Sequence, residues 1–183
     1  MVPRPTSKKS LIHPRGLLLD RDGVICKYLN RYLLNVEEFE LLKGVDDLIK
    51  EAKARNFIVV VITNQPQVGK KLLSESALQD IHHLMLQKLN HAIDRVYVCP
   101  HRTEDNCLCR KPSPGMLLKA QEDFNLNLSS SIFIGDSDTD IQAGKEVGCQ
   151  TIFIKNEYNQ HKLQECHPHY VIETLEEAIF LLD

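Results

Sequence analysis

A chain of 183 residues, with 43% hydrophobic and 26% charged residues, has the composition of a soluble globular protein and can bury a substantial core. The formal net charge of −3 gives no indication of nucleic-acid binding, and no run approaches the roughly 18 apolar residues that span a bilayer. We therefore expect neither a nucleic-acid partner nor an association with a membrane. Residues 1–15 are basic without the apolar stretch of a signal peptide, so we expect a disordered lead-in there, one domain over residues 16–183, and a cytoplasmic protein.

The first predicted strand is the apolar run over residues 16–19, which ends in Asp20-Arg21-Asp22-Gly23. Such a run stopped by glycine is typical of a buried strand in a parallel sheet. Side chains alternate along an extended chain, so Asp20 and Asp22 are expected to project together and Arg21 elsewhere. Two carboxylates so close need a cation or a shared proton, although an ordinary turn after a strand explains the same residues.

Strands and helices alternate through the rest of the chain. Residues 26–42 have no clean period and are predicted as a loop over the strand ends, and residues 44–55 as an amphipathic helix. Further helices are predicted to begin after Ser74, at Ser113-Pro114, after Asp136 and after Thr174. Further strands are predicted at 57–62, 95–98, 131–134, 151–154 and 170–172. This alternation predicts an α/β fold with a three-layer, Rossmann-like parallel sheet and helices on both faces.

Polar residues follow the apolar runs at four places, and the carboxyl ends of parallel strands share one edge of a sheet. They supply a carboxylate nucleophile, a second carboxyl for acid/base work, and a hydroxyl, an amide and an ammonium for phosphoryl oxygens. A further carboxylate completes a Mg²⁺ site, so the set is one for phosphoryl transfer. The residues are Asp20 with Asp22, Thr63 with Asn64, Lys111, and Asp136 with Asp140.

These motifs, which occur in family order between Gly16 and Ile154, resemble those of the haloacid dehalogenase superfamily of Mg²⁺-dependent phosphatases. The resemblance implies that Asp20 is the nucleophile and a Mg²⁺ ligand. It implies that Asp22 is the general acid/base, with its backbone carbonyl on the Mg²⁺. Asp136 would be a further Mg²⁺ ligand, and Asp140 would act through water or by orienting Lys111. Thr63 and Lys111 would bind the phosphoryl group, supported by Asn64.

Three thiols and one imidazole lie within one short loop, at Cys99, His101, Cys107 and Cys109. This set suits a closed tetrahedral Zn²⁺ site of structural type. The alternatives are free cysteines or a Cys-x-Cys disulfide, which is disfavoured by its strained geometry. Because the loop runs into Arg110 and Lys111, zinc would also hold two cations beside the phosphate. The other cysteines, Cys26, Cys149 and Cys166, are predicted as core or surface thiols.

The cysteine loop followed by Arg-Lys-Pro is similar to two phosphatase groups of the superfamily. One acts on D-glycero-D-manno-heptose 1,7-bisphosphate in lipopolysaccharide-sugar synthesis, and the other, our alternative, acts on histidinol phosphate. Thr63-Asn64-Gln65-Pro66 looks more like the heptose group, although Lys70 and Lys71 stand where that group usually shows Arg-Gly, and Arg31 where Gly is common before Tyr. Arg110, with its bidentate fork, is the candidate for a second anionic group of the substrate.

Short insertions leave no room for a separate cap domain, so loops 26–42 and 99–110 are expected to shape the pocket. The expected partner is a small phosphorylated metabolite, bound by a monomer. An alternative from another class is a phospho-acceptor signalling module, in which phosphorylation of Asp20 is only a signal; an acid/base at Asp22 favours turnover instead. A zinc-ribbon interaction module and a dinucleotide-binding enzyme are disfavoured by the acidic charge and by the lack of Gly-x-Gly-x-x-Gly.

Overall fold

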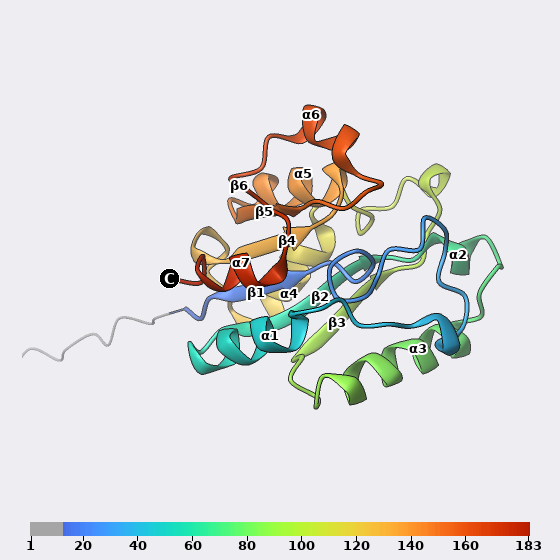
Figure 1. Ribbon diagram of the computed structural model, residues 1–183. Coiled ribbons are helices and arrows are strands. Elements are labelled where there is room, and N and C mark those ends of the chain that lie inside the picture. The colour runs from blue at the N-terminus through green and yellow to red at the C-terminus, as the bar shows by residue number, and fades with distance from the viewer. Residues whose placement is uncertain (1–12) are drawn as a thin grey trace, which may run out of the picture.

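The computed structural model describes residues 13–183 and is built on one six-stranded parallel sheet (Figure 1). The strand order is β3-β2-β1-β4-β5-β6, so β1 lies inside the sheet, paired with β2 on one side and β4 on the other. The predicted lead-in lies outside the described residues as far as residue 12. The strands are β1 (Gly16–Leu19), β2 (Ile58–Asn64), β3 (Arg95–Cys99), β4 (Ile132–Gly135), β5 (Gln150–Ile154) and β6 (Tyr170–Ile172).

Helices cover both faces of the sheet because its strands are apolar on both sides. Leu17 and Leu19 of β1 pack into one buried cluster, and Leu18 packs into the other. The first face is covered by α1 (Val45–Ala54), α3 (Glu75–Lys88) and α7 (Leu175–Ile179). The second is covered by α4 (Gly115–Phe124), α5 (Asp138–Glu146) and α6 (Leu163–Cys166). The prediction of a three-layer α/β fold is therefore confirmed.

Several helix ends lie where the sequence predicts them. The Ser74 side chain accepts a hydrogen bond from the Ala77 amide at the start of α3, and Thr174 forms a capping box with Glu177 at the start of α7. Helix α4 begins one residue later than predicted, at Gly115. A Cβ atom at that glycine would lie 2.2 Å from the carbonyl oxygen of Leu108, so the cysteine loop packs directly against the start of this helix.

Short elements that the sequence pattern did not indicate lie in the connections. They are α2 (Pro66–Gly69) and the 3-10 helices η1 (Val36–Glu38), η2 (Thr103–Asp105), η3 (Leu128–Ser130) and η4 (Gln160–Lys162). Loops and short turns cover the carboxyl edge of the sheet, and no separate cap domain lies over it within residues 13–183. None of the helices in this part of the chain is long and apolar enough to cross a bilayer.

Candidate active site

A cavity of about 530 Å³ opens at the carboxyl edge of the sheet, above the ends of β1, β2 and β4. The predicted loop 26–42 contributes Tyr28, Arg31, Tyr32 and Leu33 to its wall. Of the predicted loop 99–110, only Arg110 lines the cavity. The first loop therefore shapes the pocket as expected, whereas the cysteine loop does so only through its last residue. The predicted site residues that line the cavity are Asp20, Asp22, Asn64, Arg110, Lys111, Asp136 and Asp140.

Asp20 stands directly after β1, and its backbone amide donates to the Ile134 carbonyl of β4 at 3.0 Å. This bond continues the strand pairing and fixes the carboxylate at the centre of the edge. Burial raises the pKa of Asp20 to about 7, with further contributions from Asp140 and Asp22, whereas Lys111 lowers it. The carboxyl group is therefore placed where added positive charge favours its ionised, nucleophilic form.

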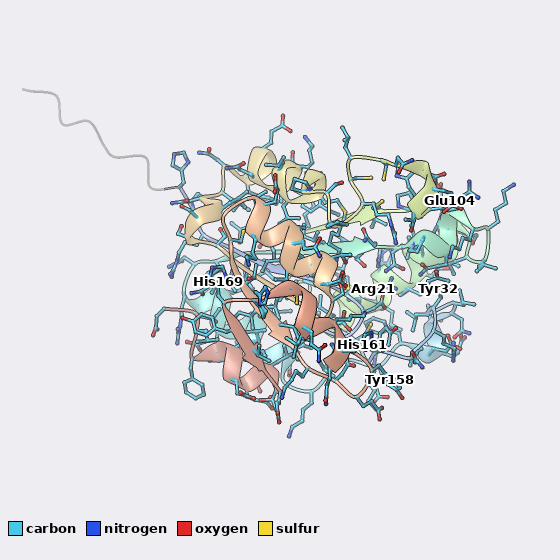
Figure 2. All side chains as sticks on the ribbon, turned by 90° about the horizontal axis from the view of Figure 1, so that it is seen from above. Arg21, Tyr32, Glu104, Tyr158, His161 and His169 are labelled. Atoms are coloured by element: carbon cyan, nitrogen blue, oxygen red, sulfur yellow. The ribbon has the colours of Figure 1, made fainter. Side chains whose placement is uncertain are left out.

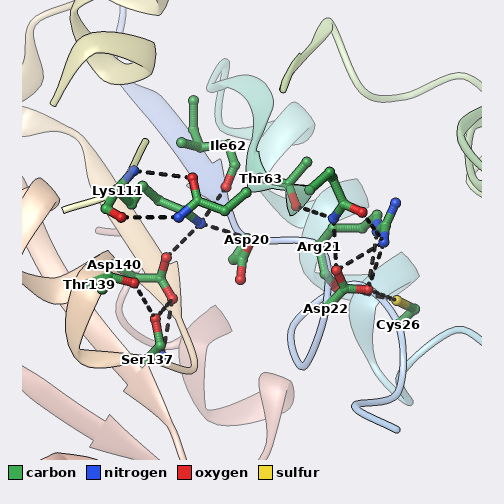
Figure 3. A network of polar contacts seen from close by, with 12 residues as sticks. Asp20, Arg21, Asp22, Cys26, Ile62, Thr63, Lys111, Ser137, Thr139 and Asp140 are labelled. Carbon is green, nitrogen blue, oxygen red and sulfur yellow. Dashed lines mark hydrogen bonds and ion pairs between the residues drawn. The ribbon is translucent and has the colours of Figure 1, made fainter. Parts of the chain in front are cut away.

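Lys111 is the ammonium group at the floor of the cavity, and its side chain is 2% exposed. Its Nζ lies 2.9 Å from Asp20 Oδ1 and 2.6 Å from Asp140 Oδ1, and it donates to the Ile62 carbonyl at 2.7 Å (Figure 3). Although burial lowers the pKa of Lys111, the carboxylates of Asp140 and Asp20 raise it above its ordinary value. This lysine is thus held charged beside the nucleophile.

Lys111 does not follow a strand directly, as the sequence interpretation assumed, because it comes at the end of the cysteine loop that leaves β3. The side chain of Asn64 holds the backbone of Lys111 at the sheet edge. Asn64 Nδ2 donates to the Lys111 carbonyl, and the Lys111 amide donates to Asn64 Oδ1, both at 3.1 Å. Asn64, predicted to support the phosphoryl site, therefore uses its amide group to position Lys111.

Asp136 and Asp140 follow β4 and complete a cluster of buried carboxylates with Asp20. The three residues each offer a ligand atom within 4.8 Å of the others, so they could hold a cation. Burial raises the pKa of Asp136 well above its ordinary value, and Asp20 and Asp140 add to this rise. Gly23, at φ +86°, allows the close approach, because a Cβ there would lie 2.3 Å from Asp136 Oδ2.

Asp140 has a second task at the start of α5. Its Oδ2 accepts hydrogen bonds from the Ser137 amide at 3.1 Å and from the Ser137 hydroxyl at 2.9 Å, and the bond from the amide belongs to the capping box of the helix. Its other oxygen is the one that contacts Lys111. A single carboxylate therefore joins the helix start to the cavity floor, which agrees with its predicted role of orienting Lys111.

Asp22 is held by Arg21, which the sequence interpretation expected to point elsewhere. The fully buried guanidinium folds back, and its Nε and Nη2 donate to Asp22 Oδ1 and Oδ2 at 3.1 and 2.9 Å. Gln65 Nε2 also donates to Asp22 Oδ2, at 2.8 Å, and Gln65 Oε1 accepts from Arg21 at the same distance. The turn after β1 ends the regular alternation of side chains, so an expectation drawn from extended geometry was wrong for Arg21.

Thr63 lies just beneath the cavity surface, 1% exposed, and does not itself line the cavity. Its hydroxyl oxygen accepts a hydrogen bond from Gln65 Nε2 at 2.8 Å (Figure 3). Gln65 and Arg21 are thus residues of the site that the sequence motifs do not indicate. Gln65 lies within the Thr-Asn-Gln-Pro motif, but nothing in that spacing indicates that its amide joins Thr63 to Asp22.

The cysteine loop brings its four predicted ligands together outside the cavity lining. The His101 Nδ1 to Cys109 Sγ distance is 3.2 Å, and the Sγ of Cys99 lies 3.6 Å from that of Cys107 and 3.3 Å from that of Cys109. Although burial raises the pKa of Cys107, hydrogen bonds from Cys109 and from the Arg110 backbone lower it to about 7. These four residues could hold a metal ion. The remaining three cysteines are buried.

Comparisons with known proteins agree with this geometry. The HAD-hydrolase-like family model matches residues 108–178. A D-glycero-alpha-D-manno-heptose-1,7-bisphosphate 7-phosphatase of Campylobacter jejuni is 39% identical over 78% of this chain and 83% of its own length, and the beta-heptose enzyme of Helicobacter pylori is 34% identical over 71% and 77%.

Among solved structures, a D,D-heptose 1,7-bisphosphate phosphatase of B. bronchiseptica, complexed with magnesium and phosphate, superposes with a TM-score of 0.85. It is 28% identical, and the match covers 92% of this chain and 97% of that one. The chain therefore belongs to the heptose 1,7-bisphosphate 7-phosphatase family of the HAD-like hydrolases, and it is a phosphatase.

Proposed function

We propose that this phosphatase removes the 7-phosphate from D-glycero-D-manno-heptose 1,7-bisphosphate through an aspartyl phosphate on Asp20. The observation that carries the proposal is the buried contact of Asp20 with Lys111, at 2.9 Å, at the floor of a cavity that opens to solvent. The names of relatives that are 39% and 34% identical support the choice of substrate. The substrate belongs to the class of small phosphorylated metabolites.

In the first step, an Asp20 carboxylate oxygen forms a bond to phosphorus while the bond from phosphorus to the sugar oxygen breaks. Asp22, held in place by Arg21 and Gln65, gives its proton to the departing sugar oxygen. In the second step, Asp22 takes a proton from water, whose oxygen attacks the same phosphorus. The acyl-phosphate bond breaks, so Asp20 is regenerated and inorganic phosphate leaves.

Lys111 and Thr63 would hold the phosphoryl oxygens during both steps. The Lys111 ammonium keeps its charge in a buried site, where electrostatic stabilisation of the transition state is strong. The Thr63 hydroxyl has its acceptor side occupied by Gln65 and can donate. Preorganised donors of this kind stabilise charge without having to reorganise during the reaction.

The carboxylate cluster fits Mg²⁺, which prefers oxygen ligands. Asp20, Asp136 and the Asp22 backbone carbonyl would hold the ion, and Asp140 would remain the partner of Lys111. The raised pKa values of Asp20 and Asp136 support this assignment, because three buried carboxylates have one directly bound ammonium between them. When bound, Mg²⁺ supplies positive charge that lowers the repulsion between Asp20 and an anionic phosphoryl group.

The second metal proposed is Zn²⁺, held by Cys99, His101, Cys107 and Cys109. Tetrahedral ligands at about 2.3 Å from zinc lie roughly 3.8 Å apart. Five of the six pairs of ligand atoms are 3.2 to 3.7 Å apart, close to that spacing. Zinc would rigidify the loop that presents Arg110 and Lys111. Metal analysis of the purified protein should find about one zinc per chain, and a chelator should lower an activity that Mg²⁺ alone does not restore; protein without zinc would refute the assignment.

We also propose that residues 16–183 act as one catalytic domain, that the enzyme works as a monomer and that it is cytoplasmic. Size-exclusion chromatography with light scattering checks the oligomeric state, and cell fractionation checks the location. A stable dimer or a membrane-bound fraction would contradict these proposals without affecting the assigned chemistry.

Phosphate release from a matched set of substrates tests the substrate assignment. With Mg²⁺ present, we expect kcat/KM for one anomer of heptose 1,7-bisphosphate to exceed that for histidinol phosphate by at least about 100-fold, since the second phosphate adds charge-assisted contacts. Faster hydrolysis of histidinol phosphate would replace the proposed substrate with our alternative. Stoichiometric phosphorylation of Asp20 without turnover would favour a signalling module.

A further inference from the structure

The cationic side chains that line the cavity differ in whether a carboxylate already pairs with them. Lys111 contacts two carboxylates, and Arg31 forms an ion pair with Glu38 at 2.9 Å. Arg110 donates to the His101 carbonyl at 3.4 Å and has no carboxylate partner among the described side chains. Lys162, which is half-buried, likewise forms no ion pair within the described part of the chain and acts on Asp136 only through space. Lys162 and Arg110 therefore keep charge available to a ligand.

These two cations reach the cavity from opposite sides of the nucleophile. Arg110 comes from the connection that leaves β3, and Lys162 comes from the connection between β5 and β6, residues 155–169. In the strand order, β3 lies two strands to one side of β1 and β5 lies two strands to the other, while Asp20 follows β1 itself. A ligand attached to Asp20 therefore has one of these cations on each side.

The β5–β6 connection is tied to the active site. The Asn159 side chain, 1% exposed, donates to the carbonyls of Asp136 at 2.8 Å and Ile154 at 2.9 Å, and it accepts from the Asn156 amide at 2.8 Å. Asn159 is also the residue before η4, which ends at Lys162. The short helix that carries Lys162 thus begins at a buried amide that bonds to the backbone of Asp136.

The same connection also touches the loop on the other side of the cavity mouth. The rings of Tyr158 and Tyr28 lie with their centroids 5.7 Å apart, and Tyr28 lines the cavity. Figure 2 labels Tyr158 and His161 on this connection and Tyr32 on the opposing loop. The connection therefore borders the pocket and contributes Lys162 to its lining, although its sequence carries none of the motifs that predict phosphatase chemistry.

We infer that Lys162 is a specificity-determining residue, which contacts the phosphate that is not transferred. It lies across the cavity from Arg110, which the sequence makes the candidate for that group. The inference rests on the proposed function, since it requires a substrate with two phosphates. The lysine side chain is long, its backbone amide donates to the Asn159 carbonyl at 3.0 Å, and its ammonium can donate up to three hydrogen bonds to phosphate oxygens. A substrate with a single phosphate on Asp20 leaves Lys162 without a ligand.

The test compares a bisphosphate with a substrate that lacks the second phosphate. For Lys162→Gln, we expect KM for heptose 1,7-bisphosphate to rise about tenfold, because a charge-assisted hydrogen bond is lost. For Lys162→Glu we expect a larger rise, because the carboxylate also repels the phosphate. Both kcat and KM for p-nitrophenyl phosphate should stay within about twofold of wild type. Lys155→Ala is the matched control, since Lys155 lies on the same connection but pairs with Glu173 at 2.6 Å and does not line the cavity.

Equal losses on both substrates would overturn the inference, because Lys162 would then act on the transferred phosphoryl group or on the fold. No change on the bisphosphate would overturn it as well. If wild type does not hydrolyse heptose bisphosphate, the proposed substrate fails, and the same variants are compared on other sugar bisphosphates and their matching monophosphates. A bisphosphate preference that Lys162→Gln abolishes would still support the inference, and a wild type with no such preference would refute it.

Discussion

Lys111 at the floor of the cavity and Lys70, the partner of Tyr32 at its rim, are both ammonium groups with close partners, but their surroundings differ. Lys111 is 2% exposed and has two carboxylates and a carbonyl around it. Lys70 is exposed, donates to the Tyr32 hydroxyl at 2.8 Å and lies 5.2 Å from the centroid of that ring. Buried charges are expensive to leave unpaired, whereas exposed pairs contribute little.

The floor and the rim of the cavity therefore have different roles. The floor is preorganised for the phosphoryl group, which every phosphomonoester shares, and its side chains have little freedom to move. The rim consists of solvent-accessible pairs such as Arg31 with Glu38, which exchange partners at low cost. Substitutions at the floor should therefore affect chemistry and stability, and substitutions at the rim should affect substrate binding.

Asp20→Asn should have the largest effect. An amide cannot form the acyl phosphate, so we expect kcat to fall by at least about 10⁴-fold. The substitution keeps the size of the side chain, so circular dichroism should report an intact fold. Phosphate release measured with Mg²⁺ is the assay. Turnover within tenfold of wild type would refute the nucleophile assignment.

Lys111→Met should damage both stability and activity. The variant leaves Asp20 and Asp140 buried without their shared cation, so we expect the free energy of unfolding to fall by about 3–5 kcal/mol. Urea denaturation at pH 8 measures this change. Lys70→Met is the matched control, with a loss below about 1 kcal/mol because its contact is exposed. Similar losses for the two variants would contradict the division between floor and rim.

The pH dependence of stability should report the buried carboxylate. Burial raises the pKa of Asp20 from 3.8 to about 7, so in Mg²⁺-free buffer the folded state binds this proton more tightly than the unfolded state. Its stabilising contribution is complete below about pH 4 and is lost as the pH rises through about 7. Asp20→Asn should therefore be more stable than wild type at pH 8 and lose that advantage near pH 4. Parallel stability profiles for the two proteins would contradict the raised pKa.

Tyr32→Phe should have the smallest effect. It removes the hydroxyl that accepts from Lys70 but keeps the ring, so we expect KM for the bisphosphate to change by less than about fivefold and kcat to stay the same. Steady-state kinetics on the bisphosphate and on p-nitrophenyl phosphate provide the measurement. A large fall in kcat would mean that the rim takes part in the chemistry.

Local sequence patterns were sufficient for the strands, most helix starts and the site residues that directly follow a strand. Apolar runs ended by Asp, Asn or Gly identify strands and their carboxyl ends, and parallel pairing then brings Asp20, Asn64 and Asp136 to one edge. The Cys-x-His and Cys-x-Cys pairs are close in the chain, so their clustering also follows from spacing. These features depend on contacts between neighbours in sequence or between adjacent strands.

Only the tertiary structure decided which side chains turn toward one another from distant connections. Arg21 folds back onto Asp22 because a turn follows the strand. Asn64 holds Lys111 at the sheet edge by a hydrogen bond to its backbone carbonyl. Lys162 comes to the cavity because Asn159 bonds to the backbone beside β4, although the two segments are far apart in the chain. Side-chain periodicity carries no information about such contacts, since each depends on where an irregular loop returns to the sheet.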